Sequence, residues 1–162
     1  MFREMRRKKQ QLAPERVEEI LSRRTAGTLA VLGDEGYPYA VPLSYVYHNG
    51  RIYFHCAKAG HKLDAIRGCD KVSFCVIDQD EIVSAEFTTY FRSVIVFGRA
   101  REVSDPAELM DAMKAFAGKY SPKESEDSFR IEMKVSKASL CVLAIDIEHK
   151  TGKEAVELVN KG

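Results

Sequence analysis

The sequence lacks the features that mark several classes of protein. Its 162 residues include no Trp and only five Pro, and its four Cys form no CxxC pair of the kind found in zinc or redox motifs. No segment approaches the roughly 20 consecutive apolar residues of a transmembrane helix, and no apolar signal-peptide core follows the first residues. Neither a Walker motif nor GxGxxG is present. We therefore expect a cytoplasmic protein without a membrane partner.

An excess of charge of one sign is also missing. Lys and Arg number 25 against 24 Asp and Glu, so the formal net charge is only +1 and does not favour nucleic acid as a partner. The local exception is residues 1–9, where five basic residues accompany one glutamate. We interpret residues 1–12 as a flexible basic arm and residues 13–162 as one domain, large enough to bury its own core. A nucleic-acid role would rest on this arm alone.

The four cysteines are predicted to be reduced residues, three of them in strands, rather than metal ligands or disulfide partners. Two alternatives involve the histidines beside Cys56. A metal site through His55 and His61 has no visible third ligand. A nucleophilic Cys56 activated by His55 is disfavoured, because neighbouring side chains of a strand point to opposite faces.

Hydrophobic periodicity predicts about six strands with helices between them. The expected strands cover 27–32, 37–47, the segment after residue 50, 71–77, 93–103 and 140–147. The expected helices cover 14–24, 61–67, a segment after the N-cap Asp105, 128–135 and 153–159. Residues 78–86 are expected to form an acidic connection. Short loops favour an antiparallel barrel with peripheral helices over a doubly wound parallel sheet.

The segment 37–47 and the turn after it give the most detailed prediction. Pro38 and Pro42 cannot donate ladder hydrogen bonds, so at least part of this strand should lie at a sheet edge. Asn49-Gly50 predicts a type I′ hairpin turn, which needs a positive φ at both central residues. The resulting register would pair His48 with Arg51, Tyr45 with Phe54 and Ser44 with His55.

Two histidines and two lysines lie within residues 55–62, at a junction between a predicted strand and a predicted helix. The free N–H groups and positive dipole end of the helix beginning at His61 would attract an anion, and Lys62 would add a formal charge. This pattern indicates a phosphate site. The alternative is a solvated loop whose lysines bind nothing.

Several segments resemble a known family. The sequences YPYAVPLSYVY (37–47), IYFHCA (52–57) and GHKLDAI (60–66) resemble the FMN-binding split barrels related to pyridoxamine 5′-phosphate oxidase, and among them the Nim branch of 5-nitroimidazole-resistance flavoproteins. YFRSVIVFG (90–98) and HKTGKE (149–154) extend the resemblance, which covers most of the chain from about Val17. It implies a mainly β, six-stranded antiparallel split barrel of the Greek-key type. It also implies a homodimer with two FMN molecules in clefts between the subunits.

The resemblance implies a set of cofactor-binding residues. His61 and Lys62 would hold the FMN phosphate, and His55 would act in catalysis by positioning an electron-accepting substrate or donating a proton. The strands around them would flank the flavin, and the segment from Tyr90 could come from the other subunit. The full set is Val41, Pro42, Leu43, Ser44, His55, Cys56, Ala57, His61, Lys62, Tyr90, Arg92 and Ser93, with no metal ligand.

The implied function is an FMN-dependent oxidoreductase that passes electrons from a reduced donor to a small aromatic or nitro compound. True pyridoxamine phosphate oxidases hold the substrate phosphate with a C-terminal motif containing arginine and histidine. Here residues 153–158 read KEAVEL instead, which argues against that reaction. The alternative is a non-catalytic protein that binds flavin, haem or the deazaflavin F420 on the same barrel.

Overall fold

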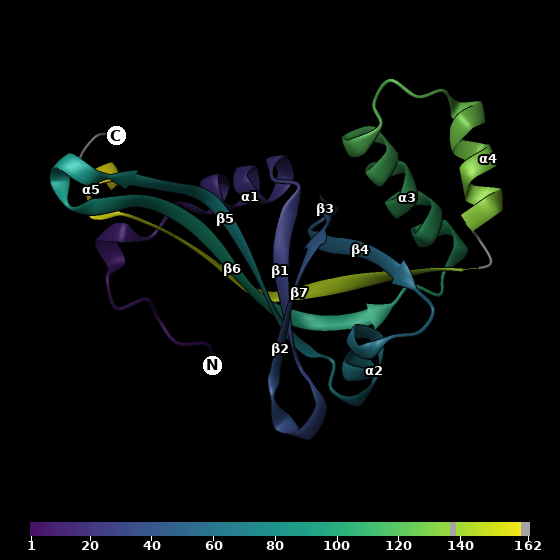
Figure 1. The fold of residues 1–162 in the computed structure, drawn as a ribbon, viewed down its shortest axis with the longest axis horizontal. Helices are drawn as coiled ribbons and strands as arrows, with labels where there is room; N and C mark the ends of the chain where they lie inside the picture. Colours follow the sequence, from purple (N-terminus) through teal and green to yellow (C-terminus); the bar gives the residue numbers. More distant parts are fainter. Residues whose placement is uncertain (137–138, 160–162) are drawn as a thin grey trace.

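The computed structural model describes residues 1–136 and 139–159. In these segments seven strands form one antiparallel sheet in the order β2-β1-β5-β6-β7-β4-β3, with helices around it (Figure 1). The mainly β fold with peripheral helices is therefore confirmed, with seven strands in place of six. The strands are β1 (Ala26–Leu32), β2 (Pro38–Ser44), β3 (Val46–His48), β4 (Arg51–Ala57), β5 (Lys71–Val83), β6 (Thr88–Glu102) and β7 (Leu140–Glu154). The α-helices are α1 (Pro14–Arg23), α2 (His61–Gly68), α3 (Pro106–Tyr120), α4 (Glu126–Ser136) and α5 (Val156–Val159).

The sheet closes on itself at Tyr45. β2 and β3 lie at opposite ends of the strand order, although this single residue separates them in the chain. Tyr45 is fully buried, and its hydroxyl donates to the Leu21 carbonyl at 2.8 Å while its N–H donates to the Thr25 carbonyl at 3.2 Å. These bonds draw the backbone out of the ladder toward the end of α1. The two sheet edges are thereby brought together as a barrel.

This bend overturns part of the prediction for residues 37–47. The continuous strand is wrong because Tyr45 divides it into β2 and β3. The predicted pairing of Tyr45 with Phe54 and of Ser44 with His55 is also wrong, since β3 pairs with β4 only from Val46, and Ser44 pairs with Ala26 of β1.

The hairpin itself is confirmed. His48 pairs with Arg51, and Asn49 and Gly50 have φ of 49° and 75°, as a type I′ turn requires. β2 stands at one end of the strand order and pairs with β1. Pro38 and Pro42 have no N–H to donate, and an edge strand accommodates this loss.

Two hydrophobic clusters fill the molecule. The larger cluster contains the inward side chains of the barrel and the buried face of α1, which consists of Val17, Ile20 and Leu21. The smaller one lies under α3 and includes Ala112 and Phe116. Asp105 caps α3 as predicted, because its carboxylate accepts hydrogen bonds from the N–H groups of Ala107 and Glu108. The Glu108 carboxylate binds Arg101 and Tyr53.

The strands extend further than periodicity predicted. The acidic connection over 78–86 is wrong: β5 continues to Val83 and pairs with the first half of β6. A register shift between Ile77 and Gln79 turns Asp78 inward, which breaks the alternation on which the prediction relied. The helix predicted over 153–159 is shortened to α5, because Lys153 and Glu154 pair with β6. Within the segment 1–12, Gln10 and Leu12 are buried.

Candidate functional site

A cleft of about 280 Å³ opens where the end of β4 meets the start of α2, beside β2. We name it the α2 cleft. It brings together four residues of the predicted site, Cys56, Ala57, His61 and Lys62. The remaining lining residues are Tyr39, Ala59, Gly60 and Leu63.

Gly60 shapes the entrance to α2. Its φ of 136° is a conformation that residues with a Cβ rarely adopt, and it lets the chain turn sharply into the helix. As N-cap, Gly60 offers no side chain to the helix N–H groups, and its carbonyl accepts from the N–H groups of Leu63 and Asp64. The first N–H groups of an α-helix have no intrahelical acceptor. This end of α2 is therefore suited to an anion.

His61 is held against β2. Its imidazole stacks on the Tyr39 ring with centroids 4.2 Å apart, and Nε2 lies 3.6 Å from the Asp34 carboxylate. The loop approaches so closely that a Cβ on Gly33 would lie 3.2 Å from Nε2 of His61. Sequence reasoning did not place Tyr39 in the site. The alternation of residues 37–47 put its side chain on the same side as Tyr37, Val41 and Leu43, and within β2 it is the member of that row nearest the loop.

Lys62 gives the cleft its positive charge. Its Nζ lies 6.0 Å from the centroid of the Phe54 ring. The charge of Lys62 also acts on His55 and Cys56, the two residues of β4 that follow Phe54. Burial, followed by the charge of Lys62, lowers the pKa of His55, and burial raises the pKa of the Cys56 thiol while Lys62 opposes that rise.

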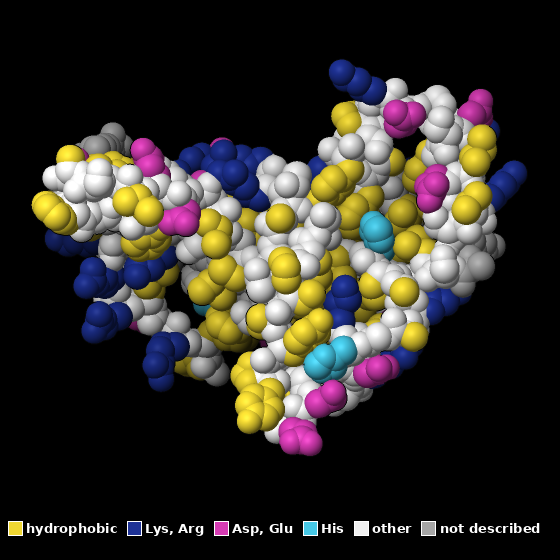
Figure 2. All heavy atoms as spheres, viewed as in Figure 1, with side chains coloured by type: hydrophobic (Ala, Val, Ile, Leu, Met, Phe, Trp, Pro, Cys, Tyr) yellow, Lys and Arg dark blue, Asp and Glu magenta, His cyan; other side chains and the backbone are white. Residues whose placement is uncertain are grey.

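His55 and Cys56 lie on opposite faces of β4, as predicted for neighbours in a strand. The His55 ring contacts Phe116 of α3 edge-on, with centroids 5.0 Å apart, whereas Cys56 lines the α2 cleft. His55 therefore faces the α3 side of the strand end. Figure 2 shows two histidine side chains on either side of a basic side chain in the hollow between the α2 and α3 regions.

A second group of predicted residues lies on the outer face of the sheet. Ladder partners share a face, so the pairs Pro42–Thr28, Thr28–Cys75 and Cys75–Ile95 define one row across four strands. We name this surface the outer face. Ser44 and Ser93 lie on it two residues along from Pro42 and Ile95. Its exposed apolar residues include Ile77, Ile95 and Phe97. Val41 and Leu43 point the other way and pack against the larger core cluster.

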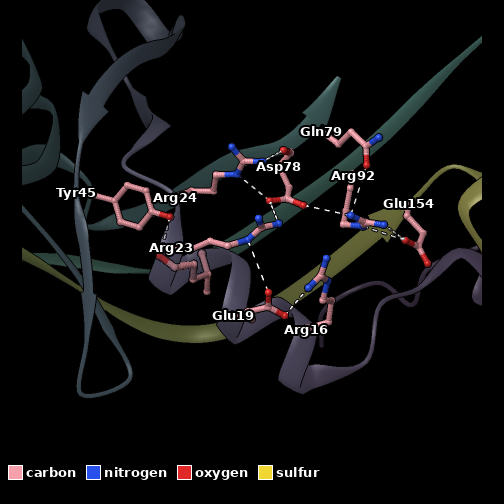
Figure 3. A network of polar contacts seen from close by, with 10 residues as sticks. Arg16, Glu19, Arg23, Arg24, Tyr45, Asp78, Gln79, Arg92 and Glu154 are labelled. Carbon is pink, nitrogen blue, oxygen red and sulfur yellow. Dashed lines mark hydrogen bonds and ion pairs between the residues drawn. The ribbon is translucent and has the colours of Figure 1, made fainter. Parts of the chain in front are cut away.

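The remaining predicted residues lie in the first part of β6, away from α2 in the same chain (Figure 1). Arg92 binds the Glu154 carboxylate at 2.9 Å and the Asp78 carboxylate at 3.4 Å. Asp78 also accepts from Arg23 and Arg24 (Figure 3). The Tyr90 hydroxyl donates to Glu86 at 2.6 Å. Within one chain, these side chains therefore stabilise the β5–β6 hairpin and do not line the α2 cleft.

A larger groove of about 910 Å³ separates α3 from α4 and is lined by apolar residues such as Leu109, Met133 and Leu140. It contains none of the predicted site residues. In residues 1–136 and 139–159, no group of three or more His, Cys, Asp or Glu side chains is arranged to hold a metal ion. The same segments contain no helix that is long and apolar enough to span a membrane.

Comparison with known proteins gives one family and many similar folds. The family model described as pyridoxamine 5′-phosphate oxidase matches residues 13–154. No curated protein matches the sequence. A conserved hypothetical protein from Mycobacterium tuberculosis superposes with a TM-score of 0.81 at 18% identity, covering 96% of this chain and 92% of that one.

Two further solved structures share the fold. A candidate 5-nitroimidazole antibiotic resistance protein from Bacteroides thetaiotaomicron has a TM-score of 0.71 at 21% identity, covering 89% of this chain and 86% of that one. An FAD- and haem-binding protein from Mycobacterium smegmatis has a TM-score of 0.68 at 20% identity, covering 91% and 74%. At these identities the structures establish the split-barrel fold alone.

Proposed function

Because the chain belongs to the pyridoxamine 5′-phosphate oxidase family, we propose that it is an FMN-binding oxidoreductase that reduces small aromatic or nitro compounds. The observation that carries the proposal is the uncapped N-terminus of α2, with Lys62 and His61 beside it, at the wall of a cleft. The FAD- and haem-binding protein with the same fold supports a flavin as the cofactor.

The α2 cleft fits the phosphate end of a flavin nucleotide. Backbone N–H groups at a helix start and a lysine side chain provide the donors that a phosphate accepts. Lys62 is partly buried, so water screens its charge less than it would on an open surface. His61 adds a ring nitrogen whose orientation is set by the stacking on Tyr39.

The α2 cleft of one chain lies just below the usual range for small-molecule pockets, which supports completion of the site by a second copy in a homodimer. Such pockets usually hold about 300–1,000 Å³, whereas the α2 cleft holds about 280 Å³. The outer face exposes Ile77, Ile95 and Phe97 in one chain. A second copy that covers this face would enlarge the cleft with its own residues and bury the apolar side chains. The first part of β6, with Tyr90 and Ser93, is the segment we propose reaches the partner's cofactor.

When bound, the flavin would supply the redox chemistry by accepting electrons from a reduced donor and passing them to the substrate. The chain would supply position. His55 has a lowered pKa, so its imidazole is mainly neutral at pH 7 and can orient a polar substrate group through a hydrogen bond. The proposed small-molecule substrate would approach the end of β4 from the α3 side, which His55 faces.

The phosphate site can be tested by comparing two ligands. FMN binding, followed by flavin fluorescence, should weaken roughly tenfold to a hundredfold in Lys62→Ala, the worth of one charge-assisted hydrogen bond. Riboflavin, which has no phosphate, should bind both proteins equally. Lys58→Ala is the matched control, because it removes a lysine of the same loop that does not line the cleft. Equal losses in the two variants, or an equal loss for riboflavin, would contradict a phosphate site at Lys62.

The redox function needs a separate experiment on the flavin-loaded protein. NADH or NADPH should bleach the flavin absorbance, and a nitroaromatic compound should restore it with turnover. His55→Gln should raise the KM for the acceptor while FMN binding stays unchanged. If the protein retains flavin but shows no turnover, it binds flavin and lacks the proposed oxidoreductase activity. A Soret band after addition of haem, without flavin retention, would replace the FMN proposal by haem binding.

A further inference from the structure

Two of the four cysteines face each other across neighbouring strands. Cys56 of β4 and Cys141 of β7 are direct partners in the antiparallel ladder, so their side chains lie on the same face. The ladder continues on both sides, from Arg51–Asp146 to Ala57–Leu140, without a register shift. The two strands therefore hold the thiols in a fixed relation.

We propose that Cys56 and Cys141 form a redox-active pair that closes to a cross-strand disulfide in the wall of the α2 cleft. Directly opposed Cα atoms in an antiparallel ladder are about 4.5 or 5.5 Å apart, and disulfides span Cα separations of about 4.4–6.8 Å. The Cα separation of directly opposed ladder residues therefore falls within the range that a disulfide spans. The proposal is independent of the flavin, because it needs only the two thiols and an oxidant.

The surroundings give the two thiols different roles. Cys56 is half-buried and lines the cleft, so a small molecule in the cleft can reach it. Cys141 is buried, and its Sγ donates to the Glu102 carboxylate at 3.5 Å. Burial and Glu102 raise the pKa of Cys141 to about 11. Burial also raises the pKa of Cys56, but the charge of Lys62 opposes that rise. Cys56 lines the cleft and is therefore the thiol that reacts with the oxidant. Cys141 then attacks the mixed disulfide formed on Cys56.

The oxidant we name is a small soluble disulfide. The Cys56 thiolate attacks one of its sulfurs, which breaks the S–S bond, forms a mixed disulfide and releases one small thiolate. The Cys141 thiolate then attacks the Cys56 sulfur and releases the second small thiolate. The protein loses two thiol hydrogens, and these protons end on the two released thiols. The small disulfide is reduced and the cysteine pair is oxidised.

The test uses the full chain with Cys69→Ser and Cys75→Ser, which leaves only the pair. Incubation with oxidised glutathione should reduce the maleimide-reactive thiols of the unfolded protein from two to none. Intact mass should show the loss of two hydrogens without an adduct. Peptide mapping should recover Cys56 joined to Cys141, and dithiothreitol should restore both thiols.

Single variants separate the roles. Cys141→Ser should accumulate a stable glutathione adduct on Cys56, and Cys56→Ser should react at least tenfold more slowly because Cys141 is buried. A persistent adduct on Cys56 with Cys141 intact, or a disulfide between two chains, would overturn the proposal. Circular dichroism of each variant, with far-UV spectra matched to the parent protein, confirms that the readout is made on folded protein. Because no flavin is present, failure here leaves the proposed FMN site untouched.

Discussion

Asp78 is a buried carboxylate among three arginines. Its side chain is 1% exposed and accepts from Arg23 at 2.5 Å and Arg24 at 2.7 Å, and Arg92 lies on its other oxygen. Replacing it with Ala removes the carboxylate that three arginines share, although Arg24 still binds the backbone carbonyl of residue 78 and Arg92 still binds Glu154. We expect a loss of about 2–3 kcal/mol of unfolding free energy, below the usual cost for a buried pair because Arg23 and Arg24 can turn into water. Urea unfolding measures it, with exposed Asp80→Ala as the control. Equal effects of the two substitutions would contradict a role for the network.

His55 should titrate below its ordinary pKa of 6.5, because burial and Lys62 both disfavour the imidazolium. The unfolded chain then binds more protons than the folded one just below that pH. This contribution to stability is full above about pH 6.5 and is lost as the pH falls through the lowered value. NMR of the imidazole measures the pKa directly. Lys62→Ala should raise it, while Lys71→Ala at the start of β5 should leave it unchanged. A pKa at or above 6.5 in the parent protein would contradict this account.

Single-residue patterns identified part of the candidate site. His61 and Lys62 could be found because a glycine, a basic pair and a helix start are adjacent in the chain. Tyr39 could not, because its contact with His61 depends on how the loop between β1 and β2 folds back over α2. The role of Asp78 was hidden in the same way, since an irregular register turns it inward from a strand that alternates elsewhere.

At the scale of elements, Asp105 fixes the start of α3. Its carboxylate accepts from the N–H groups of Ala107 at 3.3 Å and Glu108 at 3.1 Å. Asp105→Ala should cost about 1 kcal/mol of unfolding free energy, the usual worth of such a cap. Asp105→Asn should retain most of it, and exposed Lys114→Ala in mid-helix should change little. Urea unfolding of the three variants checks the order. If Asp105→Asn lost as much unfolding free energy as Asp105→Ala, the effect would come from the charge of Asp105 rather than from its hydrogen bonds as a cap.

Elements with local signals were predictable, and elements shaped by distant contacts were not. The Asn49-Gly50 turn carries its own φ requirement, so its type and the His48–Arg51 pair followed from the sequence. The break at Tyr45 depends on Leu21 and Thr25, which are about 20 residues earlier in the chain. Its alternating pattern gave no sign of the bend. The extra length of β5, β6 and β7 likewise comes from mutual pairing, which short-range periodicity cannot reveal.

At the scale of the whole molecule, the outer face and the α2 cleft each carry part of the proposed site. Ser44, Pro42 and Ser93 lie on this face, while His61 and Lys62 line the α2 cleft. In a single chain these two groups are separate surfaces. A partner that covers the outer face can place its β6 segment against the cleft, which would unite residues that the resemblance assigns to one cofactor. Dimerisation and FMN binding should therefore be lost together.

Ile95→Arg tests this coupling. Ile95 is 40% exposed in the middle of the outer face, so a charge there should leave the single chain folded but oppose burial against a second copy. Light scattering should give a mass near twice 18.3 kDa for the parent and near 18.3 kDa for the variant. FMN affinity should fall at least tenfold with it. Val135→Arg places the same charge on exposed α4, away from the outer face, and should change neither quantity. A monomeric variant that binds FMN as tightly as the parent would place the whole cofactor site within one chain.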